Sequence, residues 1–432
     1  MLTPAQRAAK ADLAETLLAA APASGNDGAW AREARALAAR RLREMGAPVR
    51  RDEYWKWTDP ATLAQVEAPE ATVFSDPAET PVFEAAGGLK LVFADGVFRP
   101  DLSDPLDGIE GVEVAPLSEA MAADIHWAKD LYGALEGEGH YVPRPLAALN
   151  TATATEGFAV RVTGRADRPL HFRYLHEDPR SDAVVHHVVR LEPGAELTVL
   201  ENGPAAARLN GCMEVDVADT ARFHHVRAQG RAHERRAFTA MFARLGRESA
   251  YKSFTLTVNG ALTRNEQVVD FTGDDAVAHV AGACVGDRDF HHDDTVFVTH
   301  GAERCESRQV FKKVLRGEAK GIFQGKILVK AGAQKTDGYQ ISQGLLLDDT
   351  AEFLAKPELE IYADDVACSH GSTCGAVDED MLFYMRARGV PRAEAQNLLV
   401  LAFLAEAVQE IEEEALAEEV RERIAGWIDR RR

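Results

Sequence analysis

The chain has 432 residues and a formal net charge of −20, from 49 Lys and Arg against 69 Asp and Glu. Hydrophobic residues make up 46% and charged residues 27%, the balance of a globular protein that can fill its own core. A chain this acidic is a poor candidate for wrapping nucleic acid or binding an anionic membrane surface. No run of 18 apolar residues occurs in the sequence, which argues against a membrane-spanning helix.

The N-terminal segment and the cysteines both indicate a reducing compartment. The first 23 residues mix charges into a helical period and lack the uninterrupted apolar stretch of a secretory signal. The cysteines form an odd, scattered set without a C-x-x-C pair: Cys212, Cys284, Cys305, Cys368 and Cys374. Such a set is typical of free thiols rather than of a disulfide framework. We therefore expect a cytoplasmic protein.

Residues 1–150 predict a helical region with one short hairpin. Two amphipathic helices fill the first 45 residues, and Gly46 is placed to end the second of them. Residues 89–99 alternate apolar and polar positions around Asp95-Gly96, a dipeptide typical of hairpin turns. Residues 116–150 are expected to be helical and then irregular.

Residues 151–375 predict an all-β body. Short runs rich in β-branched and aromatic residues follow one another, with Gly, Asp and Pro between them every 8–15 residues. A sandwich, a barrel or a solenoid would all satisfy this pattern. Because no strict sequence repeat is visible, the period alone does not favour the solenoid.

Residues 376–432 return to a helical pattern. Gly389-Val390-Pro391 separates a short helix from the next one. Residues 398–404 are apolar on every face, so this helix is expected to be buried or to dock on a partner. The last helix is expected to bury a stripe made of Ile411, Leu416, Val420, Ile424, Trp427 and Ile428.

Several motifs resemble chemical sites without completing them. Gly321–Ile327 looks like a phosphate loop, but the glycine spacing is one residue short and no Ser or Thr follows the Lys. In His291-His292-Asp293-Asp294, strand alternation would point the two His-Asp pairs to opposite faces, so a polar strand edge is favoured over a metal site with three or four ligands. The same argument applies to His186-His187 and His224-His225.

Cys368-Ser369-His370 is the stronger candidate. Cys368 and His370 share one face if the preceding strand continues through them, and a thiolate with an imidazole suits iron or zinc. Two ligands do not complete a tetrahedral site, and Cys374 follows Gly371, where we expect the chain to have turned. The pair is therefore either half of a site that another chain completes or a buried cysteine beside a hydrogen-bonded histidine.

Longer segments identify a family resemblance. The sequences at 335–338, 345–347, 356–371 and 383–389 closely resemble the SufB/SufD family of iron–sulfur cluster assembly proteins, and its SufD branch is the more similar. Shorter matches lie at 307–309 and 323–327, and Glu53–Thr58 is similar to the family element E-x-W-K-Y-T. The resemblance covers essentially the whole chain.

The resemblance implies a right-handed parallel β-helix with helical flanks and a place in a cytoplasmic complex. It implies a non-enzymatic subunit that pairs with SufB through the β-helix and binds the ATPase SufC through the C-terminal helical region. We expect no permanent cofactor in the isolated chain and a transient iron–sulfur cluster shared with SufB. The implied cluster-assembly residues are His370, which is also the implied metal ligand, and Cys368. The expected SufC contacts are Phe383, Tyr384, Arg386 and Arg388.

Two alternatives stay open. The segment Leu347–Ala351, where SufB members carry an essential cysteine, has no thiol here, which argues against a scaffold that holds a cluster alone. Parallel β-helices also host carbohydrate lyases and hydrolases, in which Asp274-Asp275 or Asp293-Asp294 would act. Such enzymes are commonly secreted, and no signal segment is expected here.

Overall fold

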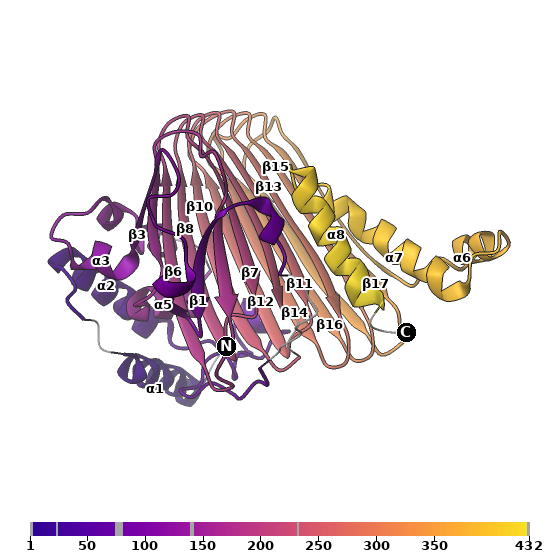
Figure 1. The fold of residues 1–432 in the computed structure, drawn as a ribbon, viewed down its shortest axis with the longest axis horizontal. Helices are drawn as coiled ribbons and strands as arrows, with labels where there is room; N and C mark the ends of the chain where they lie inside the picture. The colour runs from indigo at the N-terminus through magenta and orange to yellow at the C-terminus, as the bar shows by residue number, and fades with distance from the viewer. Residues whose placement is uncertain (1–2, 23–24, 74–80, 139–141, 231–232, 430–432) are drawn as a thin grey trace.

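The computed structural model describes residues 3–22, 25–73, 81–138, 142–230 and 233–429. Two long sheets lie face to face as the walls of a solenoid, with helices at both ends of the chain (Figure 1). Sheet A contains, in spatial order, β19 (Ala367–Gly375), β17 (Asp337–Leu346), β15 (Glu306–Leu315), β13 (Val277–Gly286), β11 (Ala250–Val258), β9 (Arg222–Gly230), β7 (Glu196–Gly203), β5 (Leu170–Leu175), β1 (Leu89–Ala94) and β2 (Val97–Phe98). Sheet B contains β18 (Glu352–Ile361), β16 (Lys320–Val329), β14 (His291–His300), β12 (Leu262–Phe271), β10 (Arg236–Leu245), β8 (Arg208–Val217), β6 (Asp182–Leu191), β4 (Phe158–Val162) and β3 (Val112–Pro116).

From β4 to β19 the chain alternates between the two sheets, and neighbouring strands in each sheet run parallel. Each coil therefore contributes one strand to each wall. Antiparallel pairing joins β1 to β2 and β3 to β4. The predicted hairpin at 89–99 is confirmed, with Ala94 opposite Val97. The mainly β fold, the parallel solenoid and the helical flanks are also confirmed.

The same backbone corner recurs in successive coils. Two residues before each sheet A strand from β7 to β17, one residue adopts a left-handed conformation, as Asp275 (φ 61°) and Arg304 (φ 54°) do. The N–H of Asp275 donates to the carbonyl of Glu303 in the next coil, at 3.0 Å, and the N–H of Arg304 donates to Gln334 at 2.9 Å. The corners of successive coils are thus joined by backbone hydrogen bonds. These bonds satisfy N–H and carbonyl groups that a turn would otherwise leave without a partner.

Helices cover the outer face of each sheet. The helices are α1 (Pro4–Ala20), α2 (Ala29–Met45), α3 (Leu117–Ala122), α4 (Ala134–Gly137), α5 (Pro145–Thr153), α6 (Glu379–Arg386), α7 (Arg392–Val408) and α8 (Glu414–Asp429), with 3-10 turns at Glu53–Trp55, Glu84–Ala86, Pro100–Leu102 and Trp127–Asp130. The N-terminal helices share a core with the outer face of sheet B. The C-terminal helices α7 and α8 share another core with sheet A.

Strand β10 shows why the strands read as nearly continuous apolar runs. Ala237, Met241 and Leu245 face the core between the sheets. Phe238 and Phe242 face the opposite way and pack against the N-terminal helices. A strand buried on both faces needs apolar residues at odd and even positions alike.

The strands β1, β2 and β3 lie within residues 1–150 and extend the two sheets at the N-terminal side. The last helix buries the predicted stripe: Leu416, Val420, Ile424, Trp427 and Ile428 are all buried, and so is Ile411 just before it. Across the described part of the chain, no helix is long and apolar enough to cross a membrane.

Candidate functional site

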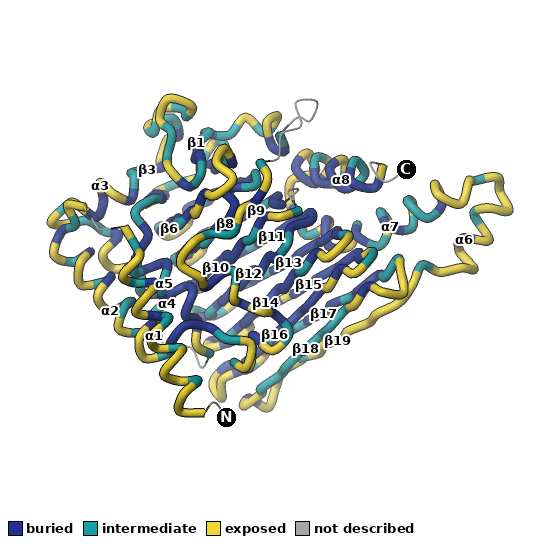
Figure 2. Tube along the Cα trace, turned by 90° about the horizontal axis from the view of Figure 1, so that it is seen from below, coloured by how far each residue is buried: buried dark blue, intermediate teal, exposed yellow. Residues whose placement is uncertain are grey.

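The solenoid ends in an uncovered coil. Strands β18 and β19 are the last strands of their sheets, and within the described residues no further strand covers them. Exposure therefore rises sharply from β17, where buried residues alternate with partly buried ones, to β19, where most residues are exposed (Figure 2). We call this end of the molecule, made of β18 and β19, the open end.

Cys368 and His370 point to the inner face of β19. A Cβ on Gly338, the neighbour of Cys368 in β17, would lie 3.2 Å from the Cys368 Sγ and 3.5 Å from Ile327 of the opposite sheet. Cys368 thus faces the interior, and strand alternation puts His370 on the same face two residues later. The predicted shared face is confirmed.

Cys374 also belongs to this face, contrary to prediction. We expected the chain to turn after Gly371, but β19 runs unbroken from Ala367 to Gly375 because each residue continues to pair with β17. Ser372 marks the same face, since its Oγ lies 2.7 Å from the Oγ of Ser342. The open end therefore carries Cys368, His370, Ser372 and Cys374 in one inward-facing row.

A buried amide column supports His370. In register, Gln309 of β15 is followed by Gln340 of β17 and then by His370. Gln340 Nε2 donates to Gln309 Oε1 at 2.5 Å, and both side chains are fully buried. Gln340 Oε1 has no hydrogen-bond partner among the residues that the structure describes. This oxygen is one strand away from an imidazole that carries N–H donors, so the column can orient His370.

The thiols of the open end are not activated by this chain alone. Burial raises the pKa of the Cys368 thiol, and it raises the pKa of the Cys374 thiol as well. The thiolate is the form that binds metal. Both cysteines therefore need a change in their surroundings that lowers the thiol pKa before they can bind one. Cys212, Cys284 and Cys305 are buried elsewhere in the fold. Within the described residues, no three His, Cys, Asp or Glu side chains gather as metal ligands.

The C-terminal helices form an arm that leaves the sheets. Helix α8 and the C-terminal half of α7 lie on sheet A, whereas α6 stands away from it in both views (Figures 1 and 2). Phe383 and Tyr384 are 73% and 54% exposed, and Arg386 and Arg388 are exposed beside them. The Arg388 guanidinium lies 3.3 Å from the centre of the Tyr384 ring. All four predicted partner contacts are thus exposed within residues 383–388, a segment that we call the α6 tip.

The other histidine motifs are structural. His292 and Asp294 face the solenoid interior and contact Lys313, with Lys313 Nζ 2.7 Å from His292 Nδ1 and 2.5 Å from Asp294 Oδ2. Asp293 faces the helical layer, where Thr58 Oγ1 donates to it at 2.6 Å. The predicted separation of the two faces is confirmed. The predicted strand edge is wrong, because β14 lies between β12 and β16 and is covered on both faces.

His186 and His224 face outward, and their neighbours His187 and His225 face the interior. His186 Nε2 lies 2.9 Å from Glu214 Oε1, and His187 Nε2 lies 3.1 Å from the Tyr174 hydroxyl. His225 Nε2 lies 2.7 Å from Glu201 Oε1. Among the described residues, none of these imidazoles lies in a set of three metal ligands.

The aspartate pairs considered for hydrolysis are bound by cations. Arg304 forms ion pairs with Asp274 at 3.2 Å and with Asp275 at 2.8 Å on a solvent-exposed turn. Asp293 pairs with Arg264 at 2.5 Å and Asp294 with Lys313 at 2.5 Å, and all four groups are buried. A general acid needs a raised carboxyl pKa in an accessible cleft, and these surroundings do not favour that role.

One functional feature was missed from the sequence. Residues 53–58, quoted only for their resemblance, cross the outer face of sheet B as a strap. The Tyr54 hydroxyl donates to Glu358 of β18 at 2.6 Å, and Lys356 of β18 forms an ion pair with Glu53 at 2.6 Å. The strap therefore fixes the last strand of sheet B from behind. The resemblance of residues 53–58 to a family element was the signal that the sequence offered for this segment. No local sequence pattern indicates that the segment contacts β18.

The geometry agrees with a comparison to known families. A family model described as "SUF system FeS cluster assembly, SufBD core domain" matches residues 174–403, more than half of the chain. The chain belongs to the SufBD core-domain family. Its role therefore lies in iron–sulfur cluster assembly by the SUF system.

Individual relatives agree with this family. The chain is 28% identical over 400 residues to the iron–sulfur cluster assembly protein SufD of Escherichia coli (strain K12), covering 89% of this chain and 90% of that protein. It is 28% identical over 397 residues to the SufBD family protein slr0076 of Synechocystis, covering 86% and 85%. With SufD of Bacillus subtilis (strain 168) it shares 27% identity over 274 residues, covering 62% and 63%.

Proposed function

We propose that this SufBD-family chain is a non-enzymatic, SufD-like subunit of a cytoplasmic assembly complex, in which the open end pairs with a SufB-type chain and His370 serves the cluster built between them. The observation that carries the proposal is the inward-facing row of β19. It presents an imidazole and two thiols on an uncovered face, and unpaired strand edges of this kind invite pairing with another chain.

The chemistry of the row fits half of a shared site. Iron in iron–sulfur clusters is held by thiolate and, less often, by imidazole ligands, and each iron needs four. The open end supplies His370 and Cys368, so a partner has to contribute the remaining ligands. In this proposal the cluster is the product of the complex and not a resident cofactor. An imidazole can also accept and donate protons during sulfur transfer.

The test of the shared site is His370→Ala in cells that depend on this complex. We expect the complex with SufB-type and SufC-type subunits to assemble as for the wild type, while the maturation of iron–sulfur enzymes falls by at least ~10-fold, as for the loss of a metal ligand or its positioning group. Ser369→Ala, one residue away on the opposite face of β19, is the matched control and should retain maturation. Cys368→Ala should reduce maturation less than His370→Ala, and Cys374→Ala least.

Two results would contradict the assignment of His370. Wild-type maturation by His370→Ala would show that the imidazole takes no part in assembly. Loss of the SufB-type subunit from the purified complex would show instead that His370 is a structural interface residue.

We further propose that the α6 tip binds the ATPase subunit. The tip carries aromatic and arginine side chains, which are enriched at the energetic centres of protein interfaces. Its exposure contrasts with the C-terminal half of α7, whose Val400 and Leu404 are covered by sheet A.

The prediction for the α6 tip is that the double variant Phe383→Ser/Tyr384→Ser loses the ATPase subunit in pull-down experiments while keeping the wild-type melting temperature. Ile125→Ser, which changes another highly exposed apolar side chain in the N-terminal region, should retain binding. Point variants are preferable to deletion of residues 380–432, because that deletion would also uncover the outer face of sheet A. Undiminished capture by the double variant would contradict the docking site.

A further inference from the structure

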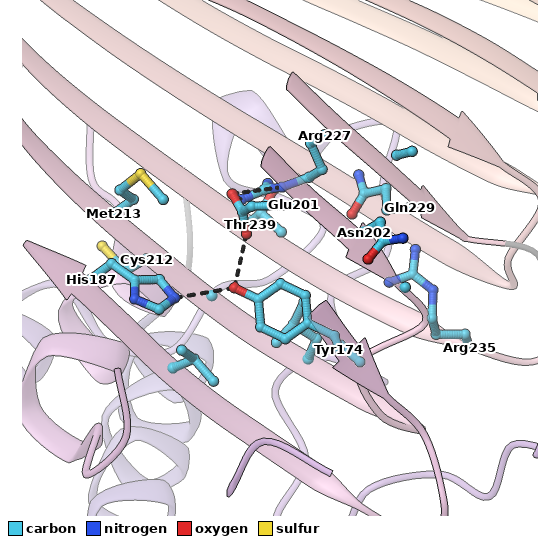
Figure 3. Close-up of a pocket in the computed structure, with 16 residues that line it drawn as sticks. Tyr174, His187, Glu201, Asn202, Cys212, Met213, Arg227, Gln229, Arg235 and Thr239 are labelled. Carbon is cyan, nitrogen blue, oxygen red and sulfur yellow. Dashed lines mark hydrogen bonds and ion pairs between the residues drawn. The ribbon is translucent and has the colours of Figure 1, made fainter. Parts of the chain in front are cut away.

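A small hollow lies inside the solenoid, well before the open end. Strands β7 and β9 of sheet A line it on one side, and β6, β8 and β10 of sheet B line it on the other (Figure 3). Its volume is about 20 Å³. A cavity holds one water molecule when it offers about 10–15 Å³, so this one suits a water molecule or a single ion of similar size.

Arg235 lines the hollow with a guanidinium that the chain does not satisfy. The side chain is fully buried, and its Nη2 donates to Thr263 Oγ1 at 3.3 Å. Within the part of the chain that the structure describes, its Nε and Nη1 are buried without a hydrogen-bond partner. Figure 3 shows the guanidinium directed toward Asn202 and Gln229 at the edge of the hollow.

The neighbouring charges do not compensate Arg235. Glu201 is the one acidic side chain among the described residues that line the hollow. Its carboxylate already accepts from Arg227 at 2.5 Å, from Tyr174 at 2.9 Å and meets His225 at 2.7 Å. Burial and the positive charge of Arg227 lower the pKa of Arg235 to about 10, so the guanidinium still carries its charge at neutral pH. An uncompensated buried charge is strongly unfavourable.

We propose that a small monovalent anion of chloride size occupies this hollow and accepts hydrogen bonds from Nε and Nη1 of Arg235. The ion supplies the negative charge and both acceptors that the chain leaves out. The volume excludes tetrahedral anions such as phosphate and sulfate, which are several times larger than a water molecule.

A second, larger hollow adjoins this position. Asn202, Gly203 and Gln229 line the inner hollow and also line one of about 530 Å³ on the outside of the solenoid. The anion site lies apart from the open end, so it is independent of the function proposed there.

The decisive experiment is crystallographic and uses the full wild-type chain. Crystals grown or soaked with sodium bromide are expected to show an anomalous peak within hydrogen-bonding distance of Arg235 Nε or Nη1. A peak-free, water-filled or empty hollow at a bromide concentration that labels other surface sites would overturn the proposal.

A solution experiment tests the role of Arg235 itself. At constant ionic strength, the melting temperature of the wild type should rise when gluconate, which is too large for the hollow, is replaced by chloride or bromide. Arg235→Gln should lose this anion-dependent rise. Arg236→Gln, at the adjacent and partly exposed arginine, should keep it. Equal anion dependence in Arg235→Gln and the wild type would overturn the proposal, and if Arg235→Gln does not fold, the bromide peak of the wild type decides alone.

Discussion

Lowering the pH from 7 to 4.5 is expected to remove most of the free energy of unfolding of this chain. The reason is a set of buried histidines whose pKa values burial depresses far below the ordinary 6.5. The pKa is lowered to about 3 for His187 and His292 and to about 4 for His224 and His300. None of these side chains is more than 7% exposed.

The sign of the effect follows from proton binding. Between pH 6.5 and about 4 the unfolded chain protonates these imidazoles and the folded chain does not, so acid favours unfolding. The stabilisation is fully present above pH 6.5 and is lost as the pH falls toward the folded pKa values. Each histidine contributes roughly 2 kcal/mol by pH 4.5. Four of them together rival the ~5–15 kcal/mol that stabilises a typical domain.

The carboxylates that are paired with cations act in a separate and lower window. Burial tends to raise the pKa of Asp294 and Glu266, but the Lys313 ammonium lowers that of Asp294, and Arg264 and Arg144 lower that of Glu266. Their contribution is present above the unfolded value of about 4.5 and is lost only below it. Loss of stability between pH 6.5 and 5 therefore reports the histidines.

Chemical denaturation at pH steps from 7.5 to 4.5 measures this dependence, and His300 offers the sharpest variant. Burial alone depresses the His300 pKa, and the ring stacks on Phe271 with its Nε2 2.9 Å from Ser307 Oγ. His300→Gln should reduce proton uptake on unfolding by about one proton between pH 6 and 4.5. Ser307→Ala removes the partner but keeps the titrating ring, so it should retain the slope. Unchanged stability from pH 7 to 5 would contradict the argument.

The sequence predicted the β body and the helical flanks, but composition alone left the solenoid undecided. The corner residues explain why. The residues Thr220, Glu248, Asp275, Arg304 and Lys335 all adopt the same left-handed conformation in successive coils, although they include a hydroxyl, two carboxylates and two cations. The coils also vary in length, since Ala250 pairs with Val277, Val277 with Glu306 and Glu306 with Asp337. The backbone repeats while the sequence does not, so the family resemblance was needed to predict the solenoid.

The candidate site was predictable where one strand determines it. Alternation along β19 correctly placed Cys368 and His370 on one face, and alternation along β14 correctly separated His292 from Asp293. Local sequence patterns could not predict which residue of another coil contacts a given side chain. Lys313 neutralises Asp294, and Arg227 neutralises Glu201, across distances in sequence that only the register of the solenoid fixes. The error at Cys374 has the same origin, because glycine is read as a turn signal when its strand partner in β17 is unknown.

The strap at residues 53–58 depends on one buried arginine. Arg264 of β12 is 1% exposed and donates to the carbonyl of Tyr54 at 2.8 Å. Its guanidinium lies 4.1 Å from the centre of the Trp55 ring and forms ion pairs with Asp293 at 2.5 Å and Glu266 at 2.7 Å. Arg264 thus joins the solenoid to the segment that fixes β18 at the open end.

Arg264→Met is expected to lower the free energy of unfolding by about 3–5 kcal/mol, the usual cost of removing one partner from a buried ion pair. Glu266 keeps a second cation, because Arg144 lies 2.6 Å from it. Asp293 keeps only neutral donors such as Thr58, so it becomes the uncompensated charge. Arg304→Met is the matched control: Arg304 also meets several carboxylates, but on an exposed turn where solvent screens the charges, so its loss should cost far less.

The double variant Arg264→Met/Asp293→Asn separates the charge effect from the loss of packing. Neutralising Asp293 should restore part of the stability lost by Arg264→Met, since it removes the buried charge that lost its partner. Hydrogen exchange should also rise first in residues 53–58 and then in β18, because Tyr54 connects Arg264 to Glu358. Equal unfolding free energies for Arg264→Met and Arg304→Met would contradict this view, as would unchanged exchange in β18. Because the strap holds β18 at the open end, Arg264→Met should also weaken the proposed pairing with a SufB-type subunit. Arg264 itself lies on β12 and not at the open end.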